Sequence, residues 1–308
     1  MSVVLGIDGG GTHTRATIVA EGRQVAFAES GSIKRLRVGA EAAEANLRAV
    51  LNDVFAQAGV KAGIKAVDAA TVGVASAALP GVAEWITAVF RDFGITRSEV
   101  VGDEVIALDA AFKGGPGILQ IAGTGSNCVG RAPDGSRENA GGWSSRLGDE
   151  GSGYWIGLHA IRRGLNAYDR EQPTRVLETV GRIWGTHSLD ELVSVGDGTP
   201  SPDFAALAPA ISRLAEEGDA VAAAVLAQAA KDLTNFVLLV RDKLRRKHNL
   251  TEEVPVAWIG SVIGKSRLVR EPFFASLNAV APQMRVTQTE VVGIEGAVWR
   301  AERLLTKV

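Results

Sequence analysis

Cysteine is nearly absent from this sequence, since Cys128 is the only one among 308 residues. One thiol cannot form a disulfide within the chain, and it cannot build a cysteine-rich zinc or iron–sulfur site on its own. Histidine is also scarce, and its spacing does not suit a metal site; the histidines are His13, His159, His187 and His248. The composition therefore excludes a disulfide framework and a cysteine-rich metal centre.

An excess of charge of one sign is lacking as well. The 33 basic and 35 acidic residues leave a formal net charge of −2, so no overall field draws the chain to nucleic acid or anionic lipid. The first residues carry no basic segment, and Gly6 and Asp8 interrupt the first apolar run, which is unlike a signal peptide. The longest apolar run, near residues 220–230, is far shorter than the roughly 20 residues of a membrane span. We expect a cytoplasmic protein with neither a nucleic-acid nor a membrane partner.

The length of 308 residues predicts two domains or one two-lobed unit. The apolar pattern predicts strands over residues 3–8, 14–20, 25–30 and 67–76, a short strand ending at 101, and helices over 40–58 and 82–93. In the second half it predicts strands over 117–122, 128–131, 254–259 and 285–288, and helices over 149–165, 203–217, 219–247, 265–280 and 294–305. Pro272 is expected to break the helix over 265–280 early.

The order of these elements repeats along the chain. Each half contains three antiparallel strands, a helix, a strand, a helix and a strand, which predicts an α/β fold with one architecture used twice. The segment "KGGPG", residues 113–117, is the expected boundary. We expect an N-terminal lobe over 1–112, with a C-terminal helix within 290–308 packing back on it, and a C-terminal lobe over 113–289.

The sequence "DGGGTHT", residues 8–14, places three glycines between two predicted strands; they are Gly9, Gly10 and Gly11. Glycine-rich turns suit phosphates, because backbone N–H groups can converge where no side chain blocks the approach. A Walker A loop would need a lysine, and a dinucleotide fingerprint would need a glycine at Thr14 followed by a helix. A phosphate-binding β-hairpin remains, in which Asp8 lies beside a divalent cation and Thr12 and Thr14 offer hydroxyls to phosphate. A plain hairpin turn is the alternative.

A second glycine–threonine turn follows the strand predicted over 117–122. Its turn residues are Gly123, Thr124, Gly125 and Ser126. Two such hairpins in equivalent places of two lobes can face each other across a cleft and hold a polyphosphate from both sides. The pair indicates nucleotide binding more strongly than either turn alone.

These turns resemble the two phosphate motifs of the actin, Hsp70 and sugar-kinase superfamily. Within it, "AGTGSNC", residues 122–128, and "GGWSSRLGDEGSGYWIG", residues 141–157, are similar to the N-acetylglucosamine kinase branch, which is grouped with the BadF/BadG/BcrA/BcrD ATPases. "WIGSV", residues 258–262, resembles the adenosine motif, and "GIEGAVW", residues 293–299, resembles the last connecting helix. The resemblance covers nearly the whole chain and implies a two-lobed actin-like, ribonuclease H-like fold around an interlobe cleft.

The resemblance also implies an ATP-dependent kinase for an amino sugar, N-acetylglucosamine or glucosamine, with another hexose derivative such as glucose as the alternative. Asp103 follows a buried strand and begins a helical stretch, and it matches the family's catalytic aspartate. That carboxylate would orient the sugar hydroxyl and accept its proton. A helix N-cap is the alternative role for Asp103. The neighbouring acids Glu104 and Asp109 match nothing in the family.

The nucleotide and its metal would use further residues that the resemblance identifies. Asp8 would hold Mg²⁺ through water, since Mg²⁺ keeps much of its hydration shell. Gly260 and Ser261 would flank the adenine or the ribose of ATP. The resemblance therefore implies ATP and Mg²⁺ as cofactors.

The sugar would be recognised mainly by residues of the segment 141–157. Asp149 matches the aspartate that hydrogen-bonds sugar hydroxyls, with a helix cap as the alternative. Ser126 and Asn127 would bind both the phosphate and the sugar. Trp143 would wall the pocket, with core packing as the alternative.

One segment departs from the family pattern. Many relatives carry an asparagine in a Gly-x-x-Asn pattern after the third strand, where it reads the sugar, and here Lys34 takes its place in "GSIKRLR", residues 31–37. A solvated loop would explain the three cations, Lys34, Arg35 and Arg37. They would also favour a substrate with a carboxylate, such as N-acetylmuramic acid, through charge-assisted hydrogen bonds.

Other classes of protein share parts of this pattern. A BadF-type activator couples ATP hydrolysis to electron transfer but uses two cysteines per chain, so the single Cys128 argues against it. A sugar-responsive repressor would need a DNA-binding helix pair ahead of the first phosphate motif, and a ROK-type kinase would show a zinc-binding cysteine cluster. A non-catalytic actin-like filament or chaperone would not need the sugar-pocket block over 141–157. Homodimers are common in the family, and we expect one here.

Overall fold

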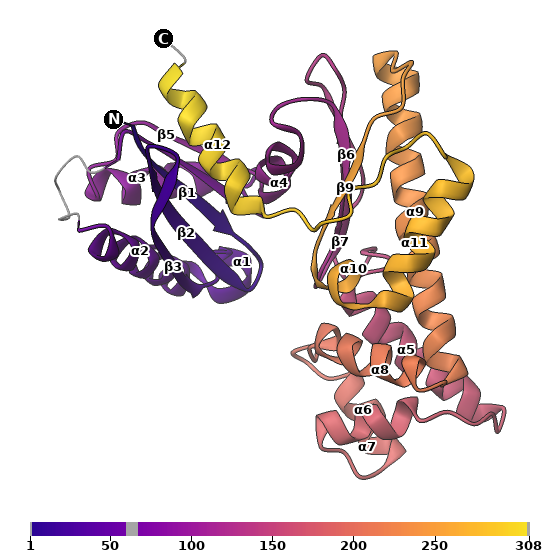
Figure 1. Ribbon diagram of the computed structural model, residues 1–308. Coiled ribbons are helices and arrows are strands. Elements are labelled where there is room, and N and C mark those ends of the chain that lie inside the picture. The colour runs from indigo at the N-terminus through magenta and orange to yellow at the C-terminus, as the bar shows by residue number, and fades with distance from the viewer. Residues whose placement is uncertain (1, 60–66, 307–308) are drawn as a thin grey trace. The chain divides into compact units, whose positions relative to one another are not determined.

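The computed structural model describes residues 2–59 and 67–306 and separates into two units (Figure 1). Unit 1 contains Met1–Gly115 and Val291–Val308, and unit 2 contains Pro116–Glu290. Each unit has its own sheet and its own buried core.

The sheet of unit 1 has five strands in the order β3-β2-β1-β4-β5. Their bounds are β1 Val3–Gly9, β2 His13–Ala20, β3 Arg23–Gly31, β4 Ala69–Val74 and β5 Ser98–Val101. The first three strands are antiparallel neighbours, whereas β4 and β5 run parallel to β1. The carboxyl ends of β1, β4 and β5 therefore meet at one edge of the sheet.

The helices of unit 1 are α1 Arg35–Val38, α2 Ala40–Gln57, α3 Val82–Asp92, α4 Asp103–Phe112 and α12 Gly293–Thr306. Helix α2 buries Leu47, Leu51 and Val54 in the same cluster as the sheet residues Leu5 and Ile7. Helix α12 packs against β1 and α4. The helices α12 and α4 approach closely because Gly296 has no side chain. A β-carbon at that position would collide with the Ile106 carbonyl.

The sheet of unit 2 has four strands in the order β8-β7-β6-β9, with β9 parallel to β6. Their bounds are β6 Gly117–Ala122, β7 Ser126–Arg131, β8 Arg137–Gly141 and β9 Val256–Ile259. The helices are α5 Gly153–Asp169, α6 Val176–Trp184, α7 Leu189–Gly196, α8 Ala208–Glu216, α9 Ala220–His248, α10 Ser261–Lys265 and α11 Arg267–Val280, with a 3₁₀ turn, η1, over Phe204–Leu207.

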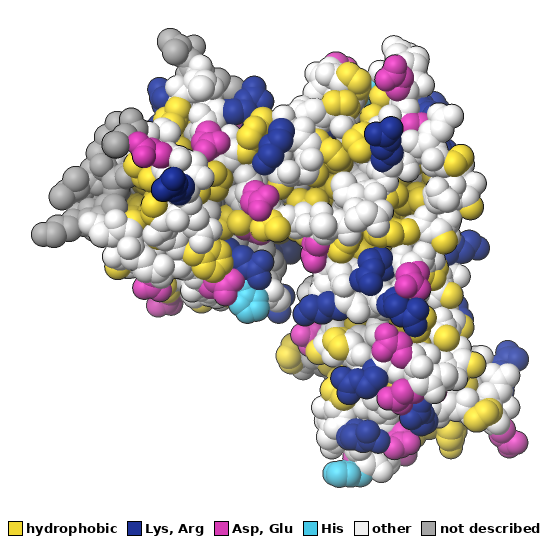
Figure 2. Space-filling view, viewed as in Figure 1, with side chains coloured by type: hydrophobic (Ala, Val, Ile, Leu, Met, Phe, Trp, Pro, Cys, Tyr) yellow, Lys and Arg dark blue, Asp and Glu magenta, His cyan; other side chains and the backbone are white. Residues whose placement is uncertain are grey.

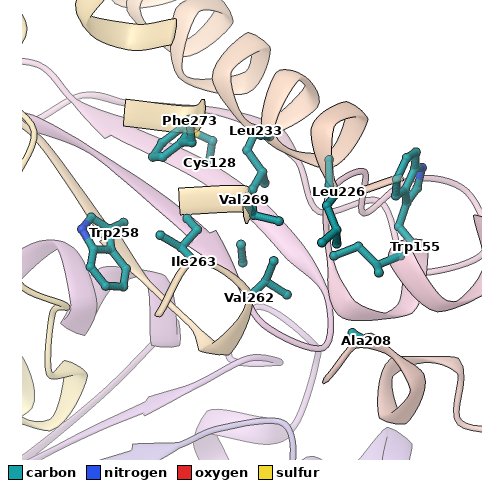
Figure 3. Packing of buried hydrophobic residues seen from close by; sticks show 14 of the residues in the cluster. Cys128, Trp155, Ala208, Leu226, Leu233, Trp258, Val262, Ile263, Val269 and Phe273 are labelled. Carbon is teal, nitrogen blue, oxygen red and sulfur yellow. The ribbon is translucent and has the colours of Figure 1, made fainter. Parts of the chain in front are cut away.

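Helix α9 is the central helix of the unit 2 core. It is the one helix in the described part of the chain that is long and apolar enough to cross a membrane by length and composition. Its apolar side packs instead on β6, β7, β8, α5, α8 and α11. Figure 3 shows part of this core, including Leu226 and Leu233 from α9, Ile263, Val269 and Phe273, and the buried Cys128.

Charges of both signs are interspersed over the face shown in Figure 2. The basic run at the end of α9 is engaged in ion pairs. Arg245 lies 2.7 Å from Glu253, and Lys247 lies 3.0 Å from Glu138. These cations therefore neutralise neighbouring acids and complement the carboxyl end of the helix.

The predicted α/β class is confirmed, and most predicted elements lie within a few residues of their observed bounds. The strand predicted over 285–288 is wrong, because only a single bridge joins Val256 and Val286. The helix predicted over 265–280 does not break at Pro272. Two helices meet at Ser266 instead, and Pro272 lies inside α11. The strand predicted from 128 begins at Ser126, because the turn before it is shorter than expected.

Candidate functional site

Two acids lie at the carboxyl edge of the unit 1 sheet. Asp8 of β1 pairs with Gly73 of β4, and Gly73 pairs with Val101 of β5. Asp103 follows two residues after Val101, so its side chain belongs to the same edge as Asp8. The two carboxylates interact, since the charge of Asp8 helps to raise the pKa of Asp103.

Asp103 is the first residue of α4, and Gly102 is the N-cap. The N-cap alternative for Asp103 is therefore wrong, although its Oδ1 accepts the N–H of Glu104 at 3.0 Å. Burial raises the pKa of Asp103 to about 7, and the charge and hydrogen bond of the Glu104 carboxyl and the charge of Asp8 add to the effect. A carboxylate with a pKa near neutrality is well suited to accept a proton at physiological pH.

Asp8 is a half-buried carboxylate near the start of α12. Burial raises its pKa, and the positive charge of Arg15 opposes that effect. A β-carbon built on Gly293, the first residue of α12, would lie 3.2 Å from Asp8 Oδ2. A cation beside Asp8 would relieve the cost of its buried charge.

The glycines of the first turn have different surroundings. A β-carbon at Gly9 would lie 2.6 Å from Ile33 Cδ1, so Gly9 is needed for packing. A β-carbon at Gly10 would lie 3.2 Å from the His13 carbonyl oxygen, whereas one at Gly11 would meet no heavy atom within 4 Å. The space beside Gly11 is therefore open, and no packing contact requires a glycine at this position.

The two threonines of this turn also differ. Thr12 is exposed, and its hydroxyl lies 3.1 Å from His13 Nδ1. Thr14 is fully buried in β2, and its hydroxyl has no hydrogen-bond partner within the described part of the chain. Of the two hydroxyls predicted to face phosphate, the structure presents that of Thr12 at the surface.

The segment that follows β3 packs against the first turn. Ser32 Oγ donates to the Gly10 carbonyl at 3.3 Å, and Asn46 Nδ2 donates to the Ser32 carbonyl at 2.8 Å. Lys34 is half-buried at the start of α1, and it forms no ion pair with any described residue. Arg35 instead lies 4.7 Å over the ring of Trp85, so it packs within the unit.

The second turn, in unit 2, repeats the arrangement of the first. A β-carbon at Gly123 would meet nothing within 4 Å, and Thr124 beside it is exposed. A β-carbon at Gly125 would lie 2.7 Å from Asp149 Oδ2, so the absence of a side chain lets that carboxylate approach the turn. Ser126 is buried at the start of β7, and its hydroxyl donates to the Glu150 carbonyl at 2.8 Å.

Asp149 lies in the connection before α5. The helix expected from residue 149 begins at Gly153, with Ser152 as its N-cap accepting the Trp155 N–H at 3.1 Å. Asp149 has a φ of 59°, which is incompatible with a helix start, so both the predicted helix boundary and its capping role are wrong. The N–H of Gly153 donates to the Gly123 carbonyl at 2.8 Å and fixes α5 against the second turn.

Asn127 and Trp143 complete the predicted sugar-reading residues. Asn127 Oδ1 is buried without a hydrogen-bond partner among the described residues, and a β-carbon at Gly142 would lie 3.1 Å from it. Trp143 is 72% exposed, so the core-packing alternative is wrong. Trp143 thus offers an aromatic face to solvent in the same connection as Asp149.

A pocket of about 290 Å³ lies between the second turn and α10. Its volume is near the lower end of the range for small-molecule sites. The wall is made largely of small side chains, including Gly123, Thr124, Gly153, Ser212, Ser261 and Val262. Ser261 was predicted to flank a nucleoside, and Gly260 precedes it in a conformation with φ of 116° that only glycine adopts readily.

Several residues at these sites carry no local sequence signal. Arg213, Glu216 and Lys265 add charge to the pocket lining, but each resembles an ordinary exposed residue of a helix.

Two contacts of acidic residues also lack a clear sequence signal. Glu104 shares a hydrogen bond with Asp103, and only its position as the next acid in the chain indicated that contact. Glu290 accepts the Gly260 N–H at 2.8 Å across 30 residues of sequence.

Curated relatives match the chain over most of its length. An N-acetylmuramic acid/N-acetylglucosamine kinase from Clostridium acetobutylicum is 27% identical over 97% of this chain and 97% of its own. Glucosamine kinase GspK from Vibrio cholerae is 31% identical over 79% of this chain and 82% of its own.

Solved structures of sugar kinases also resemble the chain over nearly its whole length. A crystal structure from Chromobacterium violaceum, assigned as an N-acetylglucosamine kinase, has a TM-score of 0.74 and 28% identity over 97% of this chain and 98% of its own. A ROK family glucokinase from Streptomyces griseus, in complex with glucose and AMPPNP, has a TM-score of 0.59 at 17% identity over 98% of this chain and 99% of its own, which shows the fold alone. The predicted two-lobed actin-like fold is thereby confirmed. Residues 5–299 match one family, and the chain belongs to the BadF/BadG/BcrA/BcrD ATPase family.

Proposed function

We propose that this protein is an ATP-dependent kinase that transfers the γ-phosphate of ATP to a hydroxyl of an amino sugar, N-acetylglucosamine or glucosamine. The observation that carries the proposal is the pair of turns, each with an open glycine and an exposed threonine: Gly11 and Thr12 in one unit, Gly123 and Thr124 in the other. The relatives, which are named as amino-sugar kinases, support it.

Residues of both turns bind the polyphosphate of ATP in this proposal. In both turns, Gly9–Gly11 and Gly123–Gly125, the absence of side chains lets phosphate oxygens approach the backbone, and the hydroxyls of Thr12 and Thr124 assist. The Gly123 N–H already donates to the Gly125 carbonyl at 2.9 Å, so Gly123 contributes open space. Thr14 and Ser126, whose hydroxyl would first have to release the Glu150 carbonyl, are further candidates. The nucleoside lies in the unit 2 pocket, where Gly260 and Ser261 flank it. The N-terminal lobe with its C-terminal helix, and the C-terminal lobe, close over the nucleotide and exclude water.

Asp103 is the proposed base of the reaction. Its carboxylate orients the sugar hydroxyl and accepts its proton as the oxygen attacks the γ-phosphorus, while ADP leaves with the bridging oxygen. Its pKa of about 7 supports this role, because a substantial fraction is ionised at neutral pH.

Asp8 is the proposed partner of Mg²⁺. Within residues 2–59 and 67–306, no group of three His, Cys, Asp or Glu side chains could hold a metal by itself. That fits Mg²⁺, which is commonly held by one or two carboxylates together with water and substrate phosphates. When bound, Mg²⁺ neutralises charge on the phosphate oxygens. Asp8 would hold it, and the burial of Asp8 favours a cation beside its carboxylate.

Asp149, Asn127 and Trp143 are the proposed sugar-binding residues of unit 2. The buried Oδ1 of Asn127 lacks a partner among the described residues, and a sugar hydroxyl or amide N–H could supply one. A site that hydrogen-bonds its substrate discriminates strongly, because the wrong sugar leaves buried polar groups unpaired. Trp143 presents an exposed ring suitable for packing on a sugar face.

An acidic amino sugar is the second candidate substrate. Lys34 is half-buried beside the first turn and has no ion-pair partner among the described residues, so it could pair with a substrate carboxylate. N-acetylmuramic acid has such a group, and one relative is named for it. A BadF-type activator remains disfavoured, because a single buried Cys128 cannot supply two thiolates. We further propose a cytoplasmic homodimer that acts on a small sugar.

A substrate panel tests this function. Purified protein with ATP and Mg²⁺ should release ADP only when an acceptor is present, and N-acetylglucosamine, glucosamine, N-acetylmuramic acid and glucose form the panel. Turnover with an amino sugar supports the proposal. Equal ADP release with and without every sugar would refute it.

A further inference from the structure

The pocket in unit 2 depends on a very short helix. Helix α10 has five residues, Ser261–Lys265, and Ser261, Val262 and Lys265 all line the pocket. A single helical turn is unstable by itself, because nucleation fixes several residues for one hydrogen bond. Contacts from outside α10 must therefore hold this wall of the pocket in place.

The amino end of α10 is held by Glu290. The Gly260 N–H donates to Glu290 Oε1 at 2.8 Å, and a β-carbon at Gly264 would lie 3.0 Å from Glu290 Oε2. Gly260 is itself pressed against the second turn, since a β-carbon there would collide with the Ala122 carbonyl. The carboxylate therefore fixes the junction between α10 and the turn that carries Gly123.

The carboxyl end of α10 is held by a cation. Arg270 Nη1 donates to the carbonyls of Ile263 at 3.1 Å and Gly264 at 2.8 Å. The Glu290 carboxylate thus lies along the single turn of α10, from the Gly260 N–H to Gly264, whereas the positive charge of Arg270 complements its carboxyl end. Glu290 and Arg270 therefore together hold this wall of the pocket.

Glu290 is also the last residue before the chain leaves unit 2. The segment leading to it follows β9, with the Thr287 N–H donating to the Val256 carbonyl at 2.8 Å and Trp258 Nε1 donating to the Thr287 carbonyl at 3.0 Å. Three residues beyond Glu290, α12 begins at Gly293 beside Asp8. Glu290 thus contacts the pocket wall through Gly260 and also begins the segment that leads to unit 1.

We infer that Glu290 is a positioning residue for the nucleotide. It holds Gly260 and α10 in the binding-competent arrangement, and it links occupancy of the pocket to the order of the connecting segment, residues 288–292. This role rests on the proposed binding of ATP in the unit 2 pocket. Glu290 acts through Gly260 and is not among the residues lining the pocket.

Titration calorimetry with ADP tests the role directly. Glu290→Ala should weaken ADP binding about fivefold, the effect of losing one hydrogen bond of ordinary strength that keeps the wall competent. Glu290→Gln keeps an acceptor oxygen and should recover part of the affinity. Glu271→Ala is the matched control, because Glu271 is an exposed glutamate of the same unit that pairs with Arg267 within α11.

Kinetics and hydrogen exchange separate positioning from a general loss of structure. Glu290→Ala should raise the KM for ATP while kcat and the KM for the sugar stay at wild-type values. In the wild type, ADP should slow amide exchange in residues 288–292, and in Glu290→Ala this protection should be lost while the core of α9 stays protected.

The outcomes distinguish this role from the proposed function. Equal ADP affinity in wild type, Glu290→Ala and Glu290→Gln would overturn the role and leave the kinase proposal intact. A wild type that binds no ADP would overturn the nucleotide proposal and this role with it. If Glu290→Ala fails to fold, Glu290→Asp decides, because the shorter side chain withdraws its oxygens from the Gly260 N–H, and unchanged ADP affinity with unchanged protection of 288–292 would refute the coupling.

Discussion

Gly11→Ala is expected to separate folding from nucleotide binding. A β-carbon at Gly11 would meet no heavy atom within 4 Å, and the φ of this residue lies outside the left-handed region. Alanine therefore fits the folded turn. The free energy of unfolding should stay constant or rise by about 0.4–1 kcal/mol, because alanine lowers the entropy of the unfolded chain.

The expected loss lies in the affinity for ATP. In the proposed site, the open space beside Gly11 is where phosphate oxygens meet backbone N–H groups. The new methyl group would keep at least one of those charge-assisted hydrogen bonds from forming. Such a bond contributes about 1.5–3 kcal/mol, so the Kd for ATP should rise about 10- to 150-fold.

Two other glycines serve as controls for Gly11→Ala. Gly9→Ala would place a β-carbon 2.6 Å from Ile33 and 3.0 Å from the Gly73 carbonyl, so overpacking should destabilise unit 1 by about 1–3 kcal/mol. At Gly196, in α7, the nearest heavy atom to a new β-carbon is 3.7 Å away on Trp184. Gly196→Ala should therefore leave the affinity unchanged and, like Gly11→Ala, keep the free energy of unfolding constant or raise it by about 0.4–1 kcal/mol.

The assay combines urea unfolding with calorimetric titration of a non-hydrolysable ATP analogue. The expected pattern is full stability with weak binding for Gly11→Ala, low stability for Gly9→Ala, and full stability with wild-type binding for Gly196→Ala. Wild-type affinity in a stably folded Gly11→Ala variant would refute the assignment of this turn to phosphate. The plain hairpin turn would then be the correct interpretation of residues 8–14.

Three further predictions follow from the structure. Asp103 must be ionised to accept a proton and burial raises its pKa to about 7, so kcat/KM should fall as the pH drops below about 7; a flat profile through this range would exclude it as the base. Arg300→Ala removes the ion pairs to Glu99 and to the fully buried Asp109, and urea unfolding should show that the free energy of unfolding falls by about 3 kcal/mol. This value is in the lower part of the range for buried pairs, because Arg300 and Glu99 are partly exposed. Lys34→Asn should lower the preference for N-acetylmuramic acid over N-acetylglucosamine in competition kinetics, and an unchanged preference would show that Lys34 does not contact the substrate.

Much of unit 1 was predictable because its signals are local. The glycine turn at 9–11 lies between two strands with clear apolar patterns, and β1, β2 and β3 form where the pattern places them. Asp103 could be placed at a strand-to-helix junction for the same reason. Its interaction with Asp8 could not be derived from the pattern, because it depends on the register of β4 between β1 and β5.

The errors in unit 2 have physical causes that the pattern does not record. Residues 285–288 have the composition of a strand, but β9 beside them is only four residues long, and a single bridge forms. The helix expected from Asp149 starts later because Asp149 and Gly151 both adopt a positive φ. The hydrogen bond from Gly260 to Glu290 spans 30 residues and leaves no local trace in the sequence.

Transfer of labelled phosphate from ATP to sugar tests the central claim most directly. Wild-type protein with Mg²⁺, γ-phosphate-labelled ATP and N-acetylglucosamine or glucosamine should yield a labelled sugar phosphate in amounts equal to the ADP formed. Asp103→Asn should still bind ATP while forming the product about 10²–10⁴-fold more slowly. Label appearing only as inorganic phosphate, at the same rate with and without sugar, would contradict the account.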